Sequence, residues 1–170
     1  ANKVPTKVGR IALCHALTQR GGIRSEFTIT KLADHHYYVV SAGAAERYDA
    51  DFLQKRLPTD GSVALRNITG SRGVFVLAGP RARDVMAKLT DVPLDNASFP
   101  WLTGQVIEAG LATDVYALRV NFVGALGWEL HFPIEYAHGL FDAIFAAGVE
   151  LLGQQRRHRH PSCGHAAVAR

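Results

Sequence analysis

Residues 21–29 read GGIRSEFTI, and this stretch determines the fold class that we expect for the chain. Its two glycines allow a tight turn, after which apolar and polar side chains alternate through residues 23–32, as they do in a half-buried strand. Residues 11–18 can also be extended, and they end at the turn signal of residues 19–22. The sequence therefore predicts a β-hairpin in which Glu26 lies on the polar face of the second strand.

The rest of the sequence places single helix-like segments between strand-like ones. Further strands are predicted at residues 36–40, 63–68, 73–78, 105–109, 115–122 and 128–133. Helices are predicted at residues 44–57, from 79–80 to 89, and at 135–147, each from an apolar stripe at helical spacing. Residues 69–72 are expected to join two of the strands as a hairpin-like turn. The pattern predicts an α+β fold in which helices pack on a mostly antiparallel sheet.

Length and charge indicate one domain and argue against a nucleic-acid partner. The 170 residues, 48% of them hydrophobic, suffice for one sizeable core, which we place in residues 1–150. Of the 19 basic and 15 acidic side chains, four arginines and no acid lie in residues 151–170, so the two signs are equal in the rest of the chain. The neutral body offers no basic face for phosphates. The basic, His/Arg-rich tail is expected to be disordered.

The sequence lacks the signatures of several other classes of protein. No apolar run approaches the roughly 18 residues of a membrane span, and residues 1–5 do not begin a signal peptide, so we expect a cytoplasmic protein with no membrane partner. No Gly-x-Gly-x-x-Gly follows a strand, which argues against a flavin or nicotinamide site in this chain. The histidines of the tail match no closed zinc site, so no metal site is predicted.

Two carboxylates stand out as candidates for chemistry, Glu26 and Glu129. Residues 119–130 read RVNFVGALGWEL, in which a Gly-x-x-Gly turn joins two predicted strands. Glu129 should project opposite to Trp128 and Leu130, where it could accept hydrogen bonds from a polar heterocycle. For both carboxylates the alternative is a strand residue that simply faces water, and composition alone favours that alternative.

The same segments resemble the glycine-cleavage T-protein (aminomethyltransferase) family, most closely the folate-binding domain of dimethylglycine and sarcosine dehydrogenases and oxidases. Residues 21–29 are similar to the segment Gly-Gly-Ile-x-x-acidic-hydrophobic-Thr-Val/Ile. Residues 119–130 resemble the signature Arg-x-x-Tyr-x-Gly-Glu-x-Gly-aromatic-Glu-Leu, and residues 76–83 resemble a Leu-x-Gly-Pro-x-Ala helix start. The resemblance covers about residues 9–150 and implies the central part, a fragment, of an aminomethyltransferase folate-binding domain.

What the resemblance implies is a site for tetrahydrofolate. It assigns a catalytic role to Glu26, near the folate nitrogen that accepts a one-carbon unit, and recognition of the pterin to Glu129. Phe122, Trp128 and Arg119 complete the implied folate-binding set. The one-carbon unit would come from a flavin-dependent dimethylglycine/sarcosine-type oxidoreductase, so FAD is expected only in a partner domain outside this chain.

Three positions depart from the family pattern. Glu26 stands where the family has Asp, Phe122 replaces the signature Tyr, and Ala125 replaces the first signature Glu. The carboxylate thus lies one methylene further out, while a hydroxyl and a polar partner are lost. We therefore expect no activity of the chain alone. The alternative function is that of a non-catalytic folate-binding or structural remnant that acts through protein–protein association, self-association included.

Overall fold

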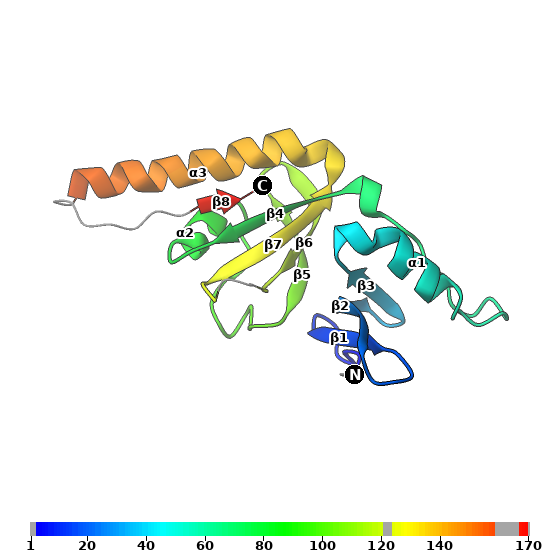
Figure 1. Ribbon diagram of the computed structural model, residues 1–170. Helices are drawn as coiled ribbons and strands as arrows, with labels where there is room; N and C mark the ends of the chain where they lie inside the picture. The colour runs from blue at the N-terminus through cyan, green and yellow to red at the C-terminus, as the bar shows by residue number, and fades with distance from the viewer. Residues whose placement is uncertain (1–2, 121–123, 159–166, 170) are drawn as a thin grey trace. The chain divides into compact units, whose positions relative to one another are not determined.

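The chain, in its computed structural model, is described at residues 3–120, 124–158 and 167–169. It forms two compact units, residues 1–69 and residues 70–170, which we call unit 1 and unit 2. The sequence analysis placed one core in residues 1–150, whereas each unit has its own sheet and helices (Figure 1). The predicted boundary between a folded domain and a tail at residue 150 stays a prediction.

Unit 1 contains a three-stranded antiparallel sheet. Its strands β1 (Ile11–Leu17), β2 (Ile23–Ala33) and β3 (His36–Val40) lie in the order β1-β2-β3. The turn between β1 and β2 contains Gly21 at φ 81°, a left-handed conformation that glycine adopts without a steric penalty. The hairpin and the third strand predicted from the sequence are confirmed.

The helix of unit 1 is attached to the sheet by a buried polar contact. The 3-10 turn η1 (Gly43–Ala45) leads into α1 (Glu46–Gln54), within the helix predicted at residues 44–57. The hydroxyl of Ser25 in β2 donates a 2.6 Å hydrogen bond to Oδ1 of Asp49 in α1, which is 4% exposed. Because a buried carboxylate without a donor is strongly disfavoured, this bond fixes where α1 sits on the sheet.

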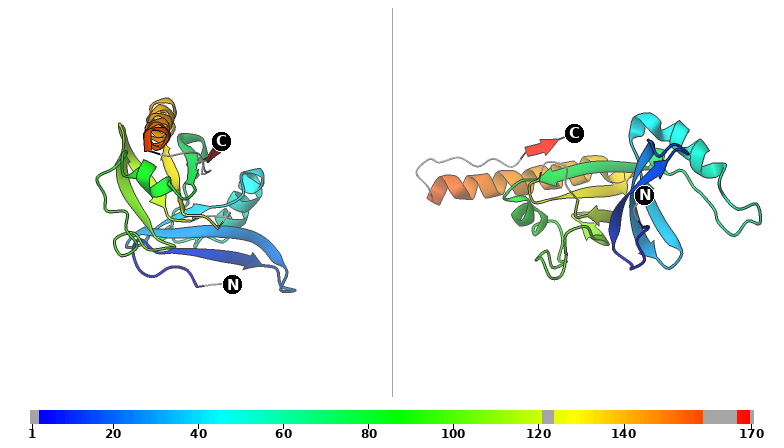
Figure 2. Two further views of the ribbon diagram at one scale, coloured as in Figure 1. Left: turned by 90° about the vertical axis from the view of Figure 1, so that its left-hand side faces the viewer. Right: turned by 60° about the horizontal axis from the view of Figure 1, so that its bottom comes forward.

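Unit 2 is built on a five-stranded antiparallel sheet with two helices. The strands lie in the order β5-β6-β7-β4-β8. They are β4 (Arg72–Ala78), β5 (Gly104–Ala109), β6 (Ala112–Leu118), β7 (Gly127–Pro133) and β8 (Ala167–Ala169). The helices are α2 (Ala82–Met86) and α3 (Ala137–His158), and 3-10 turns form η2 (Thr69–Ser71) and η3 (Ile134–Tyr136). Figures 1 and 2 show α3 running along one face of the sheet, so the predicted α+β class is confirmed.

The core of unit 2 lies between this face and the two helices. Trp128 and Leu130 of β7 are fully buried there, and α3 contributes Leu140 and Ile144, each 2% exposed. Burial of one such side chain stabilises the fold by about 1.5–3 kcal/mol. Since side chains alternate along a strand, Glu129 between the two buried residues points to the opposite face of the sheet, as predicted.

The strand predicted at residues 63–68 is wrong. These residues form no strand, and Val63 and Leu65 are 51% and 37% exposed. An alternating pattern stabilises a strand only where a neighbouring strand accepts its hydrogen bonds and packs against its side chains. The segment instead connects the two units and ends in the 3-10 turn η2.

The last helix is longer than predicted, and one strand is shorter. The stripe of α3 continues past residue 147 because Leu151, 8% exposed, adds one more buried position four residues after Ala147. The helix ends at His158. The strand predicted at residues 115–122 ends at Leu118 as β6, and residues 121–123 lie outside the described part of the chain.

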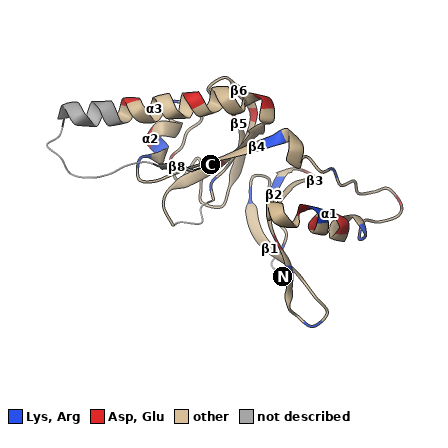
Figure 3. Ribbon diagram, turned by 45° about the horizontal axis from the view of Figure 1, so that its top comes forward, with Lys and Arg blue, Asp and Glu red and all other residues tan. Residues whose placement is uncertain are grey.

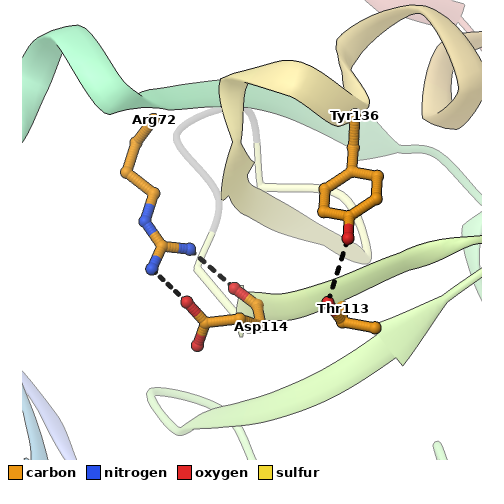
Figure 4. A network of polar contacts seen from close by, with 4 residues as sticks. All are labelled: Arg72, Thr113, Asp114 and Tyr136. Carbon is orange, nitrogen blue, oxygen red and sulfur yellow. Dashed lines mark hydrogen bonds and ion pairs between the residues drawn. The ribbon is translucent and has the colours of Figure 1, made fainter.

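A polar network ties the sheet of unit 2 together at one end (Figure 4). Arg72 at the start of β4 donates a 2.6 Å hydrogen bond to the carbonyl of Asp114 in β6 and a second, short one to its carboxylate. Both strands flank β7, so these bonds reach across it. Asp114 has φ 55°, and the arginine holds this left-handed residue in place. Tyr136 adds a 3.2 Å contact between its hydroxyl and that of Thr113.

The described helices contain both apolar and charged residues. No helix in the described ranges is both long and apolar enough to cross a membrane. Acidic and basic residues are interspersed along α1 (Figure 3).

Candidate functional site

Glu129 lies in the middle of β7, between two hydrogen-bonded neighbours. It is paired with Val76 of β4 and with Leu118 of β6. Its side chain is 15% exposed, and its Oε2 lies 3.2 Å from Nε2 of His131, a residue only 1% exposed. Because the two residues are two positions apart on one strand, their side chains share a face. The fold thus holds one oxygen of this partly buried carboxylate with a histidine.

The second carboxylate oxygen of Glu129, Oε1, is not engaged by His131. Within the described part of the chain, Oε1 makes no hydrogen bond. The Glu129 side chain is 15% exposed, and a heterocycle with adjacent N–H groups can donate charge-assisted hydrogen bonds to a carboxylate oxygen of this kind. The geometry around Glu129 therefore fits a small molecule that presents polar hydrogen atoms to a carboxylate.

Trp128, predicted to bind folate, is in the core of unit 2. It is 0% exposed, and its ring packs edge-on against Phe99 at a centroid distance of 6.0 Å. Its Nε1 is buried and has no hydrogen-bond partner among the described residues. Since Trp128 and Glu129 are consecutive on a strand, they point to opposite faces, and the structure does not bring their side chains together.

Arg119, also predicted to bind folate, lies beside Trp128. Its guanidinium carbon is 5.8 Å from the centre of the Trp128 ring, and the residue is 8% exposed. It donates a short hydrogen bond to the carbonyl of Phe99 and a 2.7 Å one to Oδ1 of Asn96. Burial, together with the nearby charge of Arg83, lowers the pKa of Arg119 from its ordinary value. These contacts make Arg119 an anchor for the loop before β5.

Glu26, the predicted catalytic residue, lies in β2 of unit 1. Its side chain is 51% exposed, and its Oε2 is 2.8 Å from Nε2 of His15. The two residues are directly opposite each other in the β1–β2 ladder. His15, with 27% of its side chain exposed, leaves the carboxylate open to solvent on one side. The hairpin therefore presents a histidine–carboxylate pair that could hold or transfer a proton at a ligand.

Each predicted carboxylate thus has a histidine partner that the sequence analysis missed. The sequence could have indicated His131 as the partner of Glu129, because residues two apart on a predicted strand share a face. His15 could be identified as the partner of Glu26 only from the register of the hairpin, which places the two residues opposite each other. Phe122, the remaining predicted folate contact, lies outside the described residues. The joint participation of Glu26 and Glu129 in one site stays a prediction.

No group of three or more potential metal ligands occurs among the described residues. Cys163 and the histidines near it belong to the tail, outside the described side chains. Cys14 is a free thiol, and burial raises its pKa above the ordinary value, which makes it a poor nucleophile.

Glu26 and Glu129 thus each lie on a strand of an α+β fold, and each contacts a histidine. The chain belongs to the GCVT N-terminal domain family, which it matches over residues 1–156. This match confirms the family resemblance that the sequence motifs at residues 21–29 and 119–130 indicated.

Curated relatives include enzymes and a regulatory protein. Human mitochondrial dimethylglycine dehydrogenase is 33% identical over 151 residues, which cover 88% of this chain and 17% of the relative. An aminomethyltransferase of Chloroherpeton thalassium is 31% identical over 78% of this chain and 36% of its own length. The mouse mitochondrial pyruvate dehydrogenase phosphatase regulatory subunit is 27% identical over 86% of the chain. The chain spans about a sixth of the length of the dehydrogenases that it matches.

Proposed function

We propose that the chain is a tetrahydrofolate-binding domain of the aminomethyltransferase type. In this proposal it receives a one-carbon unit released by a flavin-dependent dimethylglycine/sarcosine-type oxidoreductase. The observation that carries the proposal is Glu129, a partly buried carboxylate with one oxygen held by His131 and the other without a partner among the described residues. Membership of the GCVT N-terminal domain family supports it.

Glu129 would act as the anchor for the amino-pyrimidine edge of the pterin. Its charge favours two parallel hydrogen bonds from neighbouring N–H groups, as in other carboxylate pairs of this kind. His131 holds Oε2 at 3.2 Å and so limits the rotation of the carboxylate before a ligand arrives. Trp128 and Arg119 are proposed to support the site through β7, because their packing in the core holds this strand in place. Phe122 is proposed as an apolar contact of the folate.

Glu26 is proposed to act where the one-carbon unit is transferred. Tetrahydrofolate, when bound, supplies the nucleophilic nitrogen. The Glu26 carboxylate can accept the proton that this nitrogen releases, and His15 at 2.8 Å orients the carboxylate for that task. The flavin chemistry belongs to a partner domain, since this chain contains no dinucleotide-binding sequence. The dehydrogenase relatives are consistent with such a partner.

A direct test is calorimetric titration of tetrahydrofolate into the purified chain under anaerobic conditions. Glu129→Gln removes the charge and keeps the shape, so the Kd should rise by roughly 10- to 100-fold, as loss of a charge-assisted hydrogen bond does. The matched control is Glu108→Gln, an exposed strand glutamate of β5 that should leave the Kd unchanged. Absence of saturable binding by the unaltered chain, or equal effects of the two variants, would contradict the proposal.

Catalysis is separated from binding by a second measurement. The chain is supplied with tetrahydrofolate and a methylene-iminium donor, and consumption of the donor is followed with and without Glu26→Gln. Loss of turnover with unchanged folate affinity assigns a catalytic role to Glu26. Binding without turnover favours the second candidate, a non-catalytic folate-binding domain. The observation in favour of that candidate is the similarity to a relative named as a regulatory subunit.

A further inference from the structure

Unit 1 contains a groove of about 490 Å³ whose lining residues include neither Glu26 nor Glu129. It is lined by residues 17–20 at the end of β1 and in the turn that follows, by Arg24 of β2, by Phe52 of α1, and by Arg56, which follows α1. Three of the lining residues are arginines and none is acidic. A groove with this lining has a local excess of positive charge although the chain up to residue 150 is neutral.

The three arginines of the groove have no carboxylate partner among the described residues, unlike two lysines of unit 1. Lys31 pairs with Asp34 at 2.9 Å, and Lys55 pairs with Asp51 at 2.8 Å. By contrast, none of Arg20, Arg24 and Arg56 forms an ion pair with a carboxylate of the described residues. Clustered guanidinium groups repel one another, so this arrangement favours the arrival of a negative ligand.

Aromatic rings hold two of these side chains in position. The guanidinium carbon of Arg24 lies 4.4 Å from the ring centre of Tyr48 and 4.5 Å from that of Phe52. The guanidinium carbon of Arg56 lies 3.8 Å from the centre of the Phe52 ring, and its Nη1 donates a 2.9 Å hydrogen bond to the Phe52 carbonyl. Stacking occupies the faces of the guanidinium groups and leaves their N–H edges for an acceptor.

Arg24 also carries a buried donor that nothing in the described chain satisfies. Its Nε is shielded from solvent and makes no hydrogen bond. Buried N–H groups of this kind are uncommon because an unmade hydrogen bond is unfavourable. The turn that brings Arg20 to the same groove is itself fixed, since Thr18 and Gly22 form two mutual hydrogen bonds of 2.8 and 3.1 Å. The side chains of Arg24 and Arg56 and the backbone of the turn are therefore held in place by contacts within unit 1.

We propose that this groove binds a multiply charged oxyanion, with Arg24 and Arg56 as its principal ligands. The class comprises phosphate esters and polycarboxylates, whose clustered oxygens match the planar fork of a guanidinium group. Three positive charges favour an anion with two or more negative charges over a monocarboxylate. The proposal does not depend on folate binding, because none of its residues belongs to the proposed folate site.

The test is titration of inorganic phosphate, citrate and acetate into the full chain at 150 mM sodium chloride, followed by calorimetry. We expect saturable binding of phosphate, citrate or both, with acetate at least tenfold weaker, and the preferred anion identifies the ligand source. Arg56→Gln, a change at an exposed side chain, should weaken binding about tenfold or more. The matched control is Arg47→Gln, an exposed arginine on α1 outside the groove lining.

Arg24→Lys provides a second variant, because lysine keeps the positive charge but lacks the planar, forked guanidinium group. It should weaken binding while circular dichroism and the melting temperature stay close to those of the parent chain. Glu129→Gln should bind the anion as the parent does, which separates this site from the folate proposal. The inference would be overturned by equal binding of the Arg47 and Arg56 variants, by equal affinity for acetate, or by no saturable binding up to about 10 mM anion.

Discussion

At Gly127, the first residue of β7, the neighbouring strand leaves no room for a side chain. A Cβ at this position would lie 2.7 Å from the carbonyl oxygen of Leu77 and 3.0 Å from both Cα and Cβ of Ala78. These atoms belong to β4, to which Gly127 is paired in the ladder. Ordinary C···O contacts are about 3.3–3.6 Å, so Gly127→Ala must move two strand backbones apart by roughly half an ångström.

The size of the effect follows from two opposing terms. Overpacking of this kind destabilises a protein by about 1–3 kcal/mol. Replacing glycine by alanine offsets about 0.5–1 kcal/mol of that loss, because the unfolded chain becomes less flexible. We expect a net loss of about 1–2 kcal/mol, which corresponds to a melting temperature lowered by roughly 5–15 °C for a unit of this size. Movement of β7 should also weaken any ligand contact of Glu129.

The assay is urea unfolding followed by tryptophan fluorescence. Both tryptophans of the chain lie in unit 2, and Trp128 is 0% exposed whereas Trp101 is 51% exposed. In a Trp101→Phe background the signal therefore reports the core of unit 2. The matched control is Gly139→Ala in α3, where nothing lies within 4 Å of the new methyl group. This change should stabilise the helix by about 0.8–1 kcal/mol. A Gly127→Ala chain as stable as the parent would refute the reasoning about the β4–β7 contact.

Three further predictions concern the polar contacts of the two units. Ser25→Ala leaves the buried Asp49 carboxylate without its 2.6 Å donor and should lower the stability of unit 1 by about 1.5–3 kcal/mol in thermal unfolding. Ser25→Thr keeps a hydroxyl at this position and should retain most of the stability of the parent chain. Arg72→Ala removes the bonds to Asp114 and should lower the stability of unit 2 by about 1 kcal/mol, a modest value because Asp114 is half exposed; no change in the urea midpoint would contradict this. Hydrogen bonds from Ser98 and Ala97 lower the pKa of Asp95 from 3.8 to about 2. This folded pKa lies below the unfolded value, so the stabilisation is present above pH 4 and disappears as the pH falls through 2. The stability difference between the parent and Asp95→Asn should narrow over that range, and a constant difference would be inconsistent with the assignment.

The sequence alone predicted most of the fold because its strongest patterns are local. The alternation in β2 and the glycine turn before it specify a hairpin whatever surrounds them. The same holds for Glu129, since strand alternation places it opposite Trp128 without reference to any other element. Residues 63–68 show the limit of this reasoning, because a strand also needs a partner and the pattern contains no information about one.

The family and the positions of Glu26 and Glu129 in their strands were thus determined by the sequence itself. Tertiary structure decided the remaining contacts of these side chains, because such contacts form between residues that are distant in the chain. The register of β1 on β2 brings His15 to Glu26, and the packing of α1 on β2 brings Arg24 between two aromatic rings. Tertiary packing also buries the side chains of Trp128 and Arg119, which the linear motif does not specify, and their contact with folate stays a prediction.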